Sequence, residues 1–101
     1  MKEEVRGLIE QALDEYLEDE AKDAVAQVSW VEELIPITSK RELALGYLIG
    51  TMETFAQSIA ELSKRKRLSE AEEEKEDKEI NTMIRRRLTE ISECIVSELN
   101  K

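Results

Sequence analysis

The chain has 101 residues, 39% of them charged, and carries a formal net charge of −9 at pH 7. This length predicts a single domain with one core, and the negative charge argues against a general attraction to nucleic acid or anionic membranes. Histidine is absent, which removes the commonest general base and the usual zinc ligand, and the single cysteine excludes a disulfide within the chain.

The composition predicts an all-α fold over residues 1–101. Hydrophobic residues make up 41% of the chain but aromatic residues only 4%, and there are three Gly and one Pro. An aliphatic interior with so few turn-forming residues is typical of helical bundles and coiled coils. The charged start, MKEEV, does not resemble a signal peptide, and no window is apolar enough to span a membrane. We therefore expect a cytoplasmic protein.

The first predicted helix covers about residues 2–27. Apolar residues recur at steps of three and four from Val5 to Val28, with charged residues on the opposite side. The pattern weakens over residues 18–20, where the helix either continues straight or bends. We favour one continuous helix.

A short helical turn is expected over about residues 30–35, in the segment that follows the first helix. Ser29 with Glu33 has the pattern of a helix start, and Pro36 ends the turn because the residue before proline is driven out of the α region. The segment also contains Trp30 and other apolar residues. We expect it to fold down as a lid on the end of the bundle.

The central helix is predicted over about residues 39–67, with Thr38 or Ser39 as its cap and with Ser39 and Glu42 in capping-box spacing. Its residues 43–60 contain one charge, Glu53. Six large apolar residues follow the spacing of a heptad seam and share one face: Leu45, Leu48, Met52, Phe55, Ile59 and Leu62. We expect this seam to be an interface with other helices.

Gly46 and Gly50 form a GxxxG pair well round the central helix from that seam. This spacing lets two helix backbones approach closely. Each glycine costs about 1 kcal/mol relative to alanine in a soluble helix, so we expect a close helical neighbour, such as the first helix, to offset the cost. The alternative is that two glycines are simply tolerated.

The third helix is predicted over about residues 69–99 and begins with a capping box at Ser69 and Glu72. With the central helix it forms a long helical hairpin that turns near Leu68. The apolar seams of these two helices are out of register by roughly 5–8 Å, so the third helix cannot cover the whole central seam. The first helix or a second chain must cover the rest. We predict a three-helix antiparallel bundle that dimerises into a larger bundle.

Two basic runs have the composition of a phosphate-binding surface: Lys64, Arg65, Lys66 and Arg67, and Arg85, Arg86 and Arg87. Three consecutive helical residues span about 200°, so the arginines cannot form one patch, and the acidic residues 70–74 are placed to neutralise the first run. We favour an ion-paired surface. One arginine could instead pair with Glu53, which otherwise reaches water.

Carboxylates also occur in pairs with the spacing of Mg²⁺ ligands on one helical face: Glu15 with Glu18, Glu73 with Glu76, and Glu74 with Asp77. Helical nucleotide pyrophosphatases hold such pairs inside a bundle pocket, whereas these lie in fully polar stretches. A solvated surface is therefore favoured. Cys94 is expected to be a small buried hydrophobe rather than a reactive thiol. We predict no catalytic residues, no metal and no cofactor.

The sequence thus predicts a non-enzymatic helical interaction or scaffolding module that self-associates or binds a partner protein through apolar helix faces. Its interface would consist of the six seam residues with Gly46 and Gly50, and its oligomer would be a homodimer. A nucleic-acid-binding accessory protein is the main alternative, and a carboxylate–Mg²⁺ hydrolase of the pyrophosphatase type is the third.

Overall fold

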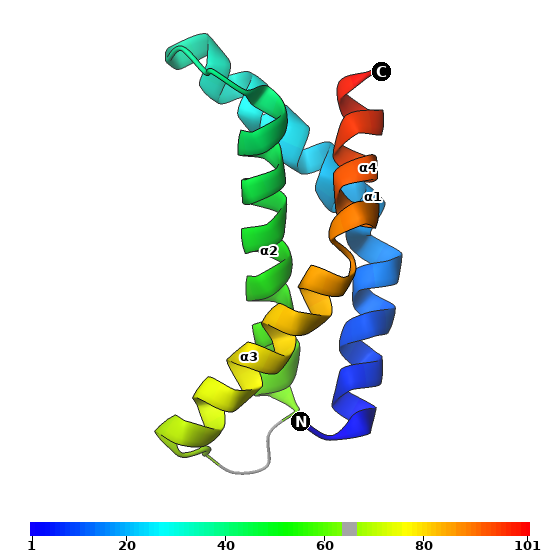
Figure 1. Cartoon of the computed structure of the whole chain (residues 1–101), viewed down its shortest axis with the longest axis vertical. Coiled ribbons are helices and arrows are strands. Elements are labelled where there is room, and N and C mark those ends of the chain that lie inside the picture. The colour runs from blue at the N-terminus through cyan, green and yellow to red at the C-terminus, as the bar shows by residue number, and fades with distance from the viewer. Residues whose placement is uncertain (64–66) are drawn as a thin grey trace.

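A computed structural model describes residues 1–63 and 67–101 of the chain. It has four helices in order: α1 (Glu3–Leu34), α2 (Lys40–Leu62), α3 (Glu70–Arg86) and α4 (Leu88–Leu99). The described residues contain no strand, which confirms the all-α prediction (Figure 1). The molecule is elongated and measures 45 × 24 × 19 Å.

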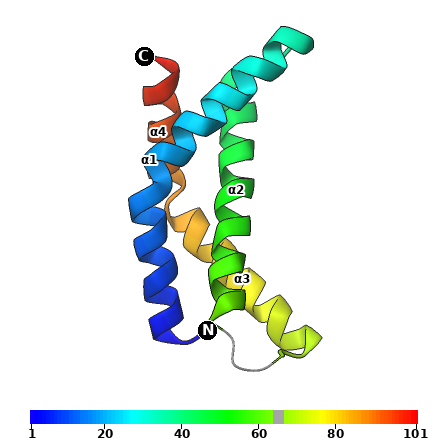
Figure 2. The same ribbon diagram turned by 180° about the vertical axis from the view of Figure 1, so that it is seen from behind.

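Helix α1 is longer than predicted and includes the residues assigned to a separate turn. Ser29 does not cap a new helix: its hydroxyl donates a hydrogen bond of 2.9 Å to the carbonyl of Val25 within α1. The last helical residue is Leu34, and the C-cap Ile35 is extended (φ −141°, ψ 152°) because it precedes Pro36. The favoured continuous helix is confirmed, but α1 also changes direction along its length, as the alternative proposed (Figure 2).

Helices α1 and α2 form the main antiparallel hairpin of the fold. Three contacts fix its register. The rings of Tyr16 and Phe55 meet edge to face with centroids 5.6 Å apart, the Tyr47 hydroxyl lies 3.4 Å from the Asp23 carboxylate, and the Lys40 ammonium lies 3.8 Å from Glu32. The sequence had placed the long hairpin between the central and third helices instead.

Helix α2 begins where predicted and ends earlier. The Ser39 hydroxyl accepts a hydrogen bond from the backbone N–H of Glu42, as expected of its cap. The last helical residue is Leu62, with Ser63 as the C-cap. The predicted continuation over residues 64–66 lies outside the described residues.

The predicted third helix is two helices, so the described chain has four helices where the sequence predicted three. Its start is confirmed, since Ser69 and Glu72 form the reciprocal capping box. Arg87 (φ −100°, ψ 7°) then leaves the helical conformation and separates α3 from α4. Burial on α3 begins only at Ile80, and most of the helix before it is exposed.

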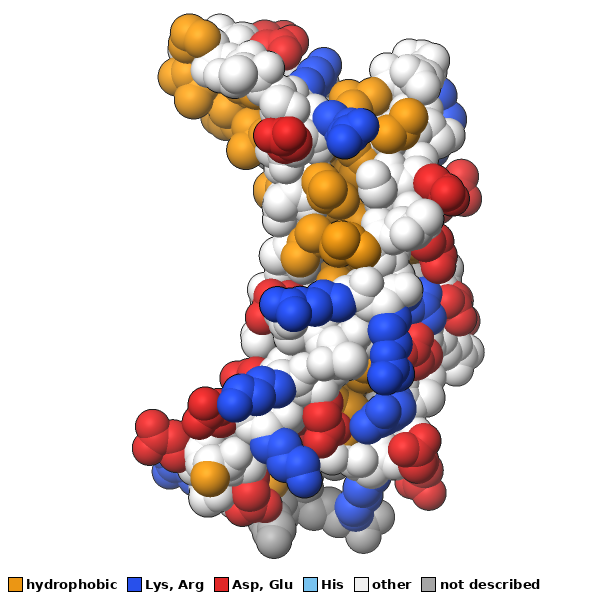
Figure 3. Space-filling model, in the orientation of Figure 1, with side chains coloured by type: hydrophobic (Ala, Val, Ile, Leu, Met, Phe, Trp, Pro, Cys, Tyr) orange, Lys and Arg blue, Asp and Glu red, His pale blue; other side chains and the backbone are white. Residues whose placement is uncertain are grey.

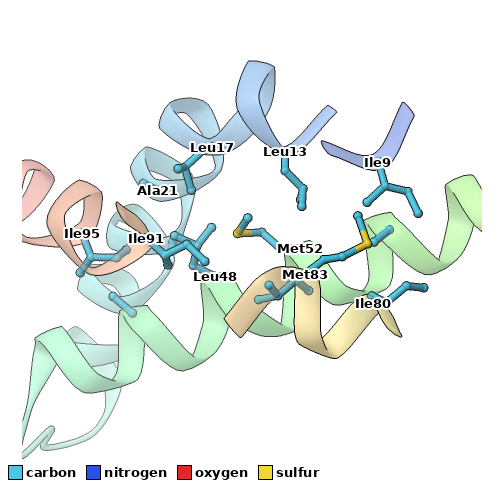
Figure 4. Packing of buried hydrophobic residues seen from close by; sticks show 14 of the residues in the cluster. Ile9, Leu13, Leu17, Ala21, Leu48, Met52, Ile80, Met83, Ile91 and Ile95 are labelled. Carbon is cyan, nitrogen blue, oxygen red and sulfur yellow. The ribbon is translucent and has the colours of Figure 1, made fainter. Parts of the chain in front are cut away.

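The core consists of aliphatic side chains and methionine, and no polar side chain is buried within residues 1–63 and 67–101 (Figure 4). Its members come from all four helices: Ile9, Leu13, Leu17, Ala21, Ala24 and Val28 of α1; Ala44, Leu48, Met52, Ala56 and Ala60 of α2; Ile80, Met83 and Ile84 of α3; Ile91 and Ile95 of α4. These side chains point toward one another from facing helices, so the interior is a single cluster.

The buried line of α2 is not the predicted heptad seam. It runs in steps of four through three alanines, and α1 also uses mainly steps of four. Rows of this kind pack ridge into groove, and alanine at the contact lets two helices approach closely. The heptad seam is therefore buried only in part: Leu48 and Met52 belong to this line, whereas its other members are alanines. Phe55 and Leu62 of the seam stay exposed.

Candidate interaction surface

The α1–α2 hairpin has one covered side and one uncovered side. In Figure 1, α4 lies in front of α1 and α3 crosses in front of the lower part of α2, while the upper part of α2 has no helix in front of it. The view from behind shows α1 and α2 in front of the other two helices (Figure 2). The core residues of α3 and α4 therefore reach the hairpin from one direction only. The opposite side faces solvent among the described residues.

All four aromatic side chains of the chain are exposed. The exposed fractions are 59% for Trp30, 47% for Tyr16, 41% for Tyr47 and 37% for Phe55. Aromatic residues bury more area than any other type and usually dominate the core. Here none of them belongs to the buried cluster.

These aromatic residues lie on the uncovered side of the hairpin. Tyr16 contacts Phe55, and Tyr47 donates a hydrogen bond to Asp23 across the two helices. Tyr16 and Trp30 each lie about two helical turns from Asp23, so the three residues share one side of α1. We use the term open face for the following residues: Tyr16, Trp30 and Leu34 of α1, with Leu43, Gly46, Tyr47, Gly50, Thr51, Thr54, Phe55 and Ser58 of α2.

The α2 part of the open face is a shallow groove without a charged side chain. It is lined by Gly46, Tyr47, Gly50, Thr51, Thr54, Phe55 and Ser58. The hydroxyls of Thr51 and Ser58 donate to backbone carbonyls of α2 itself, at 2.9 and 3.0 Å. Their polar groups are therefore already satisfied, and covering this groove would leave little hydrogen bonding to replace.

Gly46 and Gly50 do not contact α1, contrary to the prediction. Both are exposed, and a Cβ built on either would meet no atom of the described chain within 4 Å, the backbone of its own turn apart. No close neighbour within the described chain offsets their cost in helix stability. The two glycines instead lie on the open face and leave it flat at its centre.

The predicted interface residues divide into three groups. Leu48 and Met52 are core residues, and Leu45 and Ile59 are half-buried beside the core. Phe55 and Leu62 are exposed, Leu62 by 88%. The seam therefore faces mainly inward, and Phe55, Gly46 and Gly50 are the predicted residues that belong to the open face.

The sequence prediction missed the α1 part of this surface. The segment containing Trp30, Leu34 and Ile35 was expected to fold down as a lid, but these side chains are exposed by 59, 64 and 56% at the end of the hairpin. Tyr16 and Trp30 were also each assigned to a separate element. Tyr16 and Trp30 lie equally far from Asp23 in the sequence, one before it and one after it. On one continuous helix this spacing places all three residues on the same side, and it was the signal available in the sequence.

Arg87 holds the junction between α3 and α4 against α1. Its guanidinium donates to Asp14 at 2.6 Å, to the Glu10 carboxylate at 2.9 Å through Nε, and to the Glu10 carbonyl at 3.2 Å. The side chain is only 13% exposed. Burial by itself lowers the pKa of Arg87, but the hydrogen bonds to Glu10 and Asp14 outweigh it and leave that pKa raised. Arg87 is therefore a charged clasp between helices.

The other predicted basic residues do not join Arg87 in one patch. Arg85, Arg86 and Arg67 are exposed, and Lys64, Arg65 and Lys66 lie outside the described residues. On the α3–α4 side, basic and acidic side chains are interspersed over the lower half of the molecule (Figure 3). Glu53 is half-buried and forms no ion pair within the described chain, so the suggested pairing with an arginine is absent there.

The carboxylate pairs and Cys94 show no arrangement for chemistry. Within the described ranges, no group of three or more Asp, Glu, His or Cys side chains is placed to hold a metal ion. Cys94 is half-buried on α4. Burial raises the pKa of its thiol, and the charges of Glu90, Glu18, Glu93 and Glu98 raise it further. The thiol therefore stays protonated, and so poorly nucleophilic, to higher pH than an ordinary cysteine.

Comparison with protein-family models, curated proteins and solved structures finds no match to this chain. In the part of the chain that the structure describes, none of the helices combines the length and the apolar character needed to cross a membrane. The open face is consequently the feature from which a function can be inferred.

Proposed function

We propose that this chain is a non-enzymatic helical interaction module that forms a homodimer through the open face of its α1–α2 hairpin. The observation that supports the proposal is the exposure of all four aromatic residues on one side of two packed helices. A folded chain that leaves its largest side chains outside its own core retains that apolar area for association.

The composition of the open face also supports association with protein. Interface cores are enriched in aromatic residues and depleted of charge. The groove on α2 contains Tyr47 and Phe55 and no charged residue, although 39% of the chain is charged. Two hairpins packed through such faces would form a four-helix bundle, with α3 and α4 on its outside.

The nucleic-acid alternative has less support. Arg87 already binds Glu10 and Asp14, and basic side chains on the α3–α4 side of the molecule are interspersed with acidic ones (Figure 3). A phosphate backbone needs several free cations on one surface. No observation favours the third alternative, a carboxylate–Mg²⁺ hydrolase, and we do not propose it.

Sedimentation equilibrium over nanomolar to micromolar concentrations tests the proposal with two matched variants. Leu43 and Leu88 are exposed by 44 and 43%, but Leu43 belongs to the open face and Leu88 to α4. We expect the wild-type chain to be a dimer at micromolar concentration. Leu43→Ser should weaken association at least tenfold, because a two-fold contact loses two leucine side chains of about 1.5 kcal/mol each.

Leu88→Ser should leave the dissociation constant within about twofold of wild type, a difference below 0.5 kcal/mol. Circular dichroism should show the same helix content in all three proteins. A wild-type chain that stays monomeric at micromolar concentration contradicts the proposal, and so does an equal effect of both substitutions.

A further inference from the structure

We infer that the second copy packs antiparallel on the open face, α2 against α2, with the two-fold axis close to Gly50. This inference rests on the proposed self-association and adds its geometry. It depends on three features of the described residues: the order of large and small side chains along α2, the apolar side chains at both ends of the hairpin, and the area that they expose.

Large and small residues alternate in position about Gly50 on the open face of α2. Leu43 and Tyr47 precede this glycine, whereas Thr54 and Ser58 follow it. Gly46 and Phe55 have the reverse order, with the small residue before Gly50 and the large one after it. An antiparallel second copy centred close to Gly50 places Tyr47 about level with Thr54 of the second copy, Leu43 with its Ser58 and Phe55 with its Gly46. Each large side chain then meets a small one, as ridge-into-groove packing requires.

A parallel second copy would not be complementary in this way. It would place each large side chain against its own copy: Leu43 and Tyr47 before Gly50, and Phe55 after it. The helices would separate where these large side chains meet and leave a gap beside the small residues, with the loss of contacts that a gap entails. Antiparallel packing also sets the helix dipoles in the favourable relative direction.

The hairpin has exposed apolar side chains at both of its ends. Trp30 and Leu34 are exposed by 59 and 64% at one end, and Leu8 and Leu62 by 52 and 88% at the other. Because Tyr16 lies opposite Phe55, the antiparallel register places Leu8 level with Leu62. Reversing the second copy about Gly50 brings the Trp30 end of each chain to the Leu62 end of the other.

The exposed area matches what a stable dimer needs. The large apolar side chains concerned are exposed by 37 to 88%: Leu8, Tyr16, Trp30, Leu34, Leu43, Tyr47, Phe55 and Leu62. At roughly 200 Å² for each fully exposed side chain, they present on the order of 800 Å². A standard interface takes about 800 Å² from each partner. A second copy with this geometry would cover the whole set.

Disulfide cross-linking tests the geometry in a Cys94→Ser background, which removes the native thiol. Gly46→Cys and Gly50→Cys leave the single chain undisturbed, because a Cβ there meets no atom of the described chain within 4 Å beyond its own helical turn. Helices in contact at glycine lie within the 4–7 Å between Cα atoms that a disulfide spans. Ala71→Cys, exposed on α3, measures cross-linking by random collision.

We expect Gly50→Cys to cross-link to itself under mild oxidation. Gly46→Cys and Thr54→Cys should each cross-link little alone, and a mixture of the two should yield the mixed disulfide, identified by its mass. Each expected product should form at least ten times faster than the disulfide of Ala71→Cys at the same protein concentration.

Two outcomes would overturn the geometry. Self-cross-linking of both Gly46→Cys and Thr54→Cys would indicate a parallel dimer. Cross-linking no faster than that of Ala71→Cys, in variants that still sediment as dimers, would show that α2 does not face α2. In both cases the proposed function would stand, whereas a monomeric wild-type chain in sedimentation equilibrium would remove the proposed function itself.

Discussion

The two sides of the α1–α2 hairpin are built from different residues. The covered side packs its buried aliphatic side chains and methionines against α3 and α4. Apolar side chains remain visible in the upper half of that side (Figure 3). The open side contains every aromatic residue of the chain and two glycines, and no described helix covers it. The comparison teaches that hydrophobic content alone does not locate the core of a small helical chain. Side-chain size separates the two sides, because the buried line of α2 is mostly alanine, whereas the aromatic rings stay outside the core.

The largest expected difference between the two sides is in folding stability. Leu48 and Leu43 lie on the same helix, with exposures of 0 and 44%. Leu48→Ala should lower the free energy of unfolding by about 2–5 kcal/mol, because it removes buried contacts and leaves a cavity. Leu43→Ala should lower it by less than about 1 kcal/mol in the monomer.

Urea denaturation followed by circular dichroism, at a concentration where each variant is monomeric, measures this difference. A similar loss of stability in Leu43→Ala and Leu48→Ala would mean that the open side contributes to the core of the single chain. The distinction between the covered and the open side would then be wrong.

A smaller effect is expected at the clasp that closes the covered side. Arg87→Ala removes the hydrogen bonds to Glu10 and Asp14, and should lower the free energy of unfolding by about 1–2 kcal/mol, since both carboxylates can still reach water. Its neighbour Arg86 is exposed and has no such contacts, so Arg86→Ala should change stability by less than about 0.5 kcal/mol.

Thermal and urea denaturation of the two arginine variants provide the measurement. The raised pKa of Arg87 implies that its contribution is fully present at neutral pH and is lost only in strongly alkaline solution. Equal stability of Arg87→Ala and wild type would show that the α3–α4 junction does not need this clasp.

The smallest expected effect has opposite signs for folding and association. Gly46→Ala and Gly50→Ala should each raise the stability of the monomer by up to about 1 kcal/mol, because alanine favours the helix and its Cβ meets no described atom beyond its own turn. The same substitutions should raise the dissociation constant of the dimer, since they separate two closely packed helices.

Denaturation at low concentration and sedimentation at high concentration distinguish the two effects. Stabilisation of the monomer with an unchanged dissociation constant would indicate two tolerated glycines, the alternative that the sequence left open. Loss of monomer stability would instead indicate a close neighbour within the chain.

Much of the fold was predictable from local patterns. The all-α class, the capping box at Ser69 and the cap at Ser39 were predicted correctly, because caps and amphipathic periods are local properties of a sequence. The end of α1 was predicted too early because serine is a common N-cap residue. The Ser29 hydroxyl instead donates a hydrogen bond to the Val25 carbonyl within α1.

The elements predicted incorrectly depend on contacts between distant residues. The break at Arg87 coincides with its bonds to Glu10 and Asp14 on α1, and nothing in the sequence near Arg87 indicates those partners. The face of α2 that packs inward was also set by the approach of α1. Of the predicted interface residues, Phe55 of the heptad seam and the two glycines, Gly46 and Gly50, belong to the open face, because that surface consists of what the α1–α2 contact leaves uncovered.

The position of the clasp has a consequence for motion. Arg87 ties the α3–α4 junction to α1, whereas the part of α3 before Ile80 is mostly exposed and has little apolar contact. Segments of that kind open at lower free energy than the rest of a domain. The first half of α3 should therefore exchange its amide hydrogens well before the hairpin does. Fluctuations of this arm would end where Glu79 pairs with Arg6 and the N-terminal ammonium and where Ile80 enters the core, before the Arg87 clasp. They would leave the open face, on the other side of the hairpin, rigid.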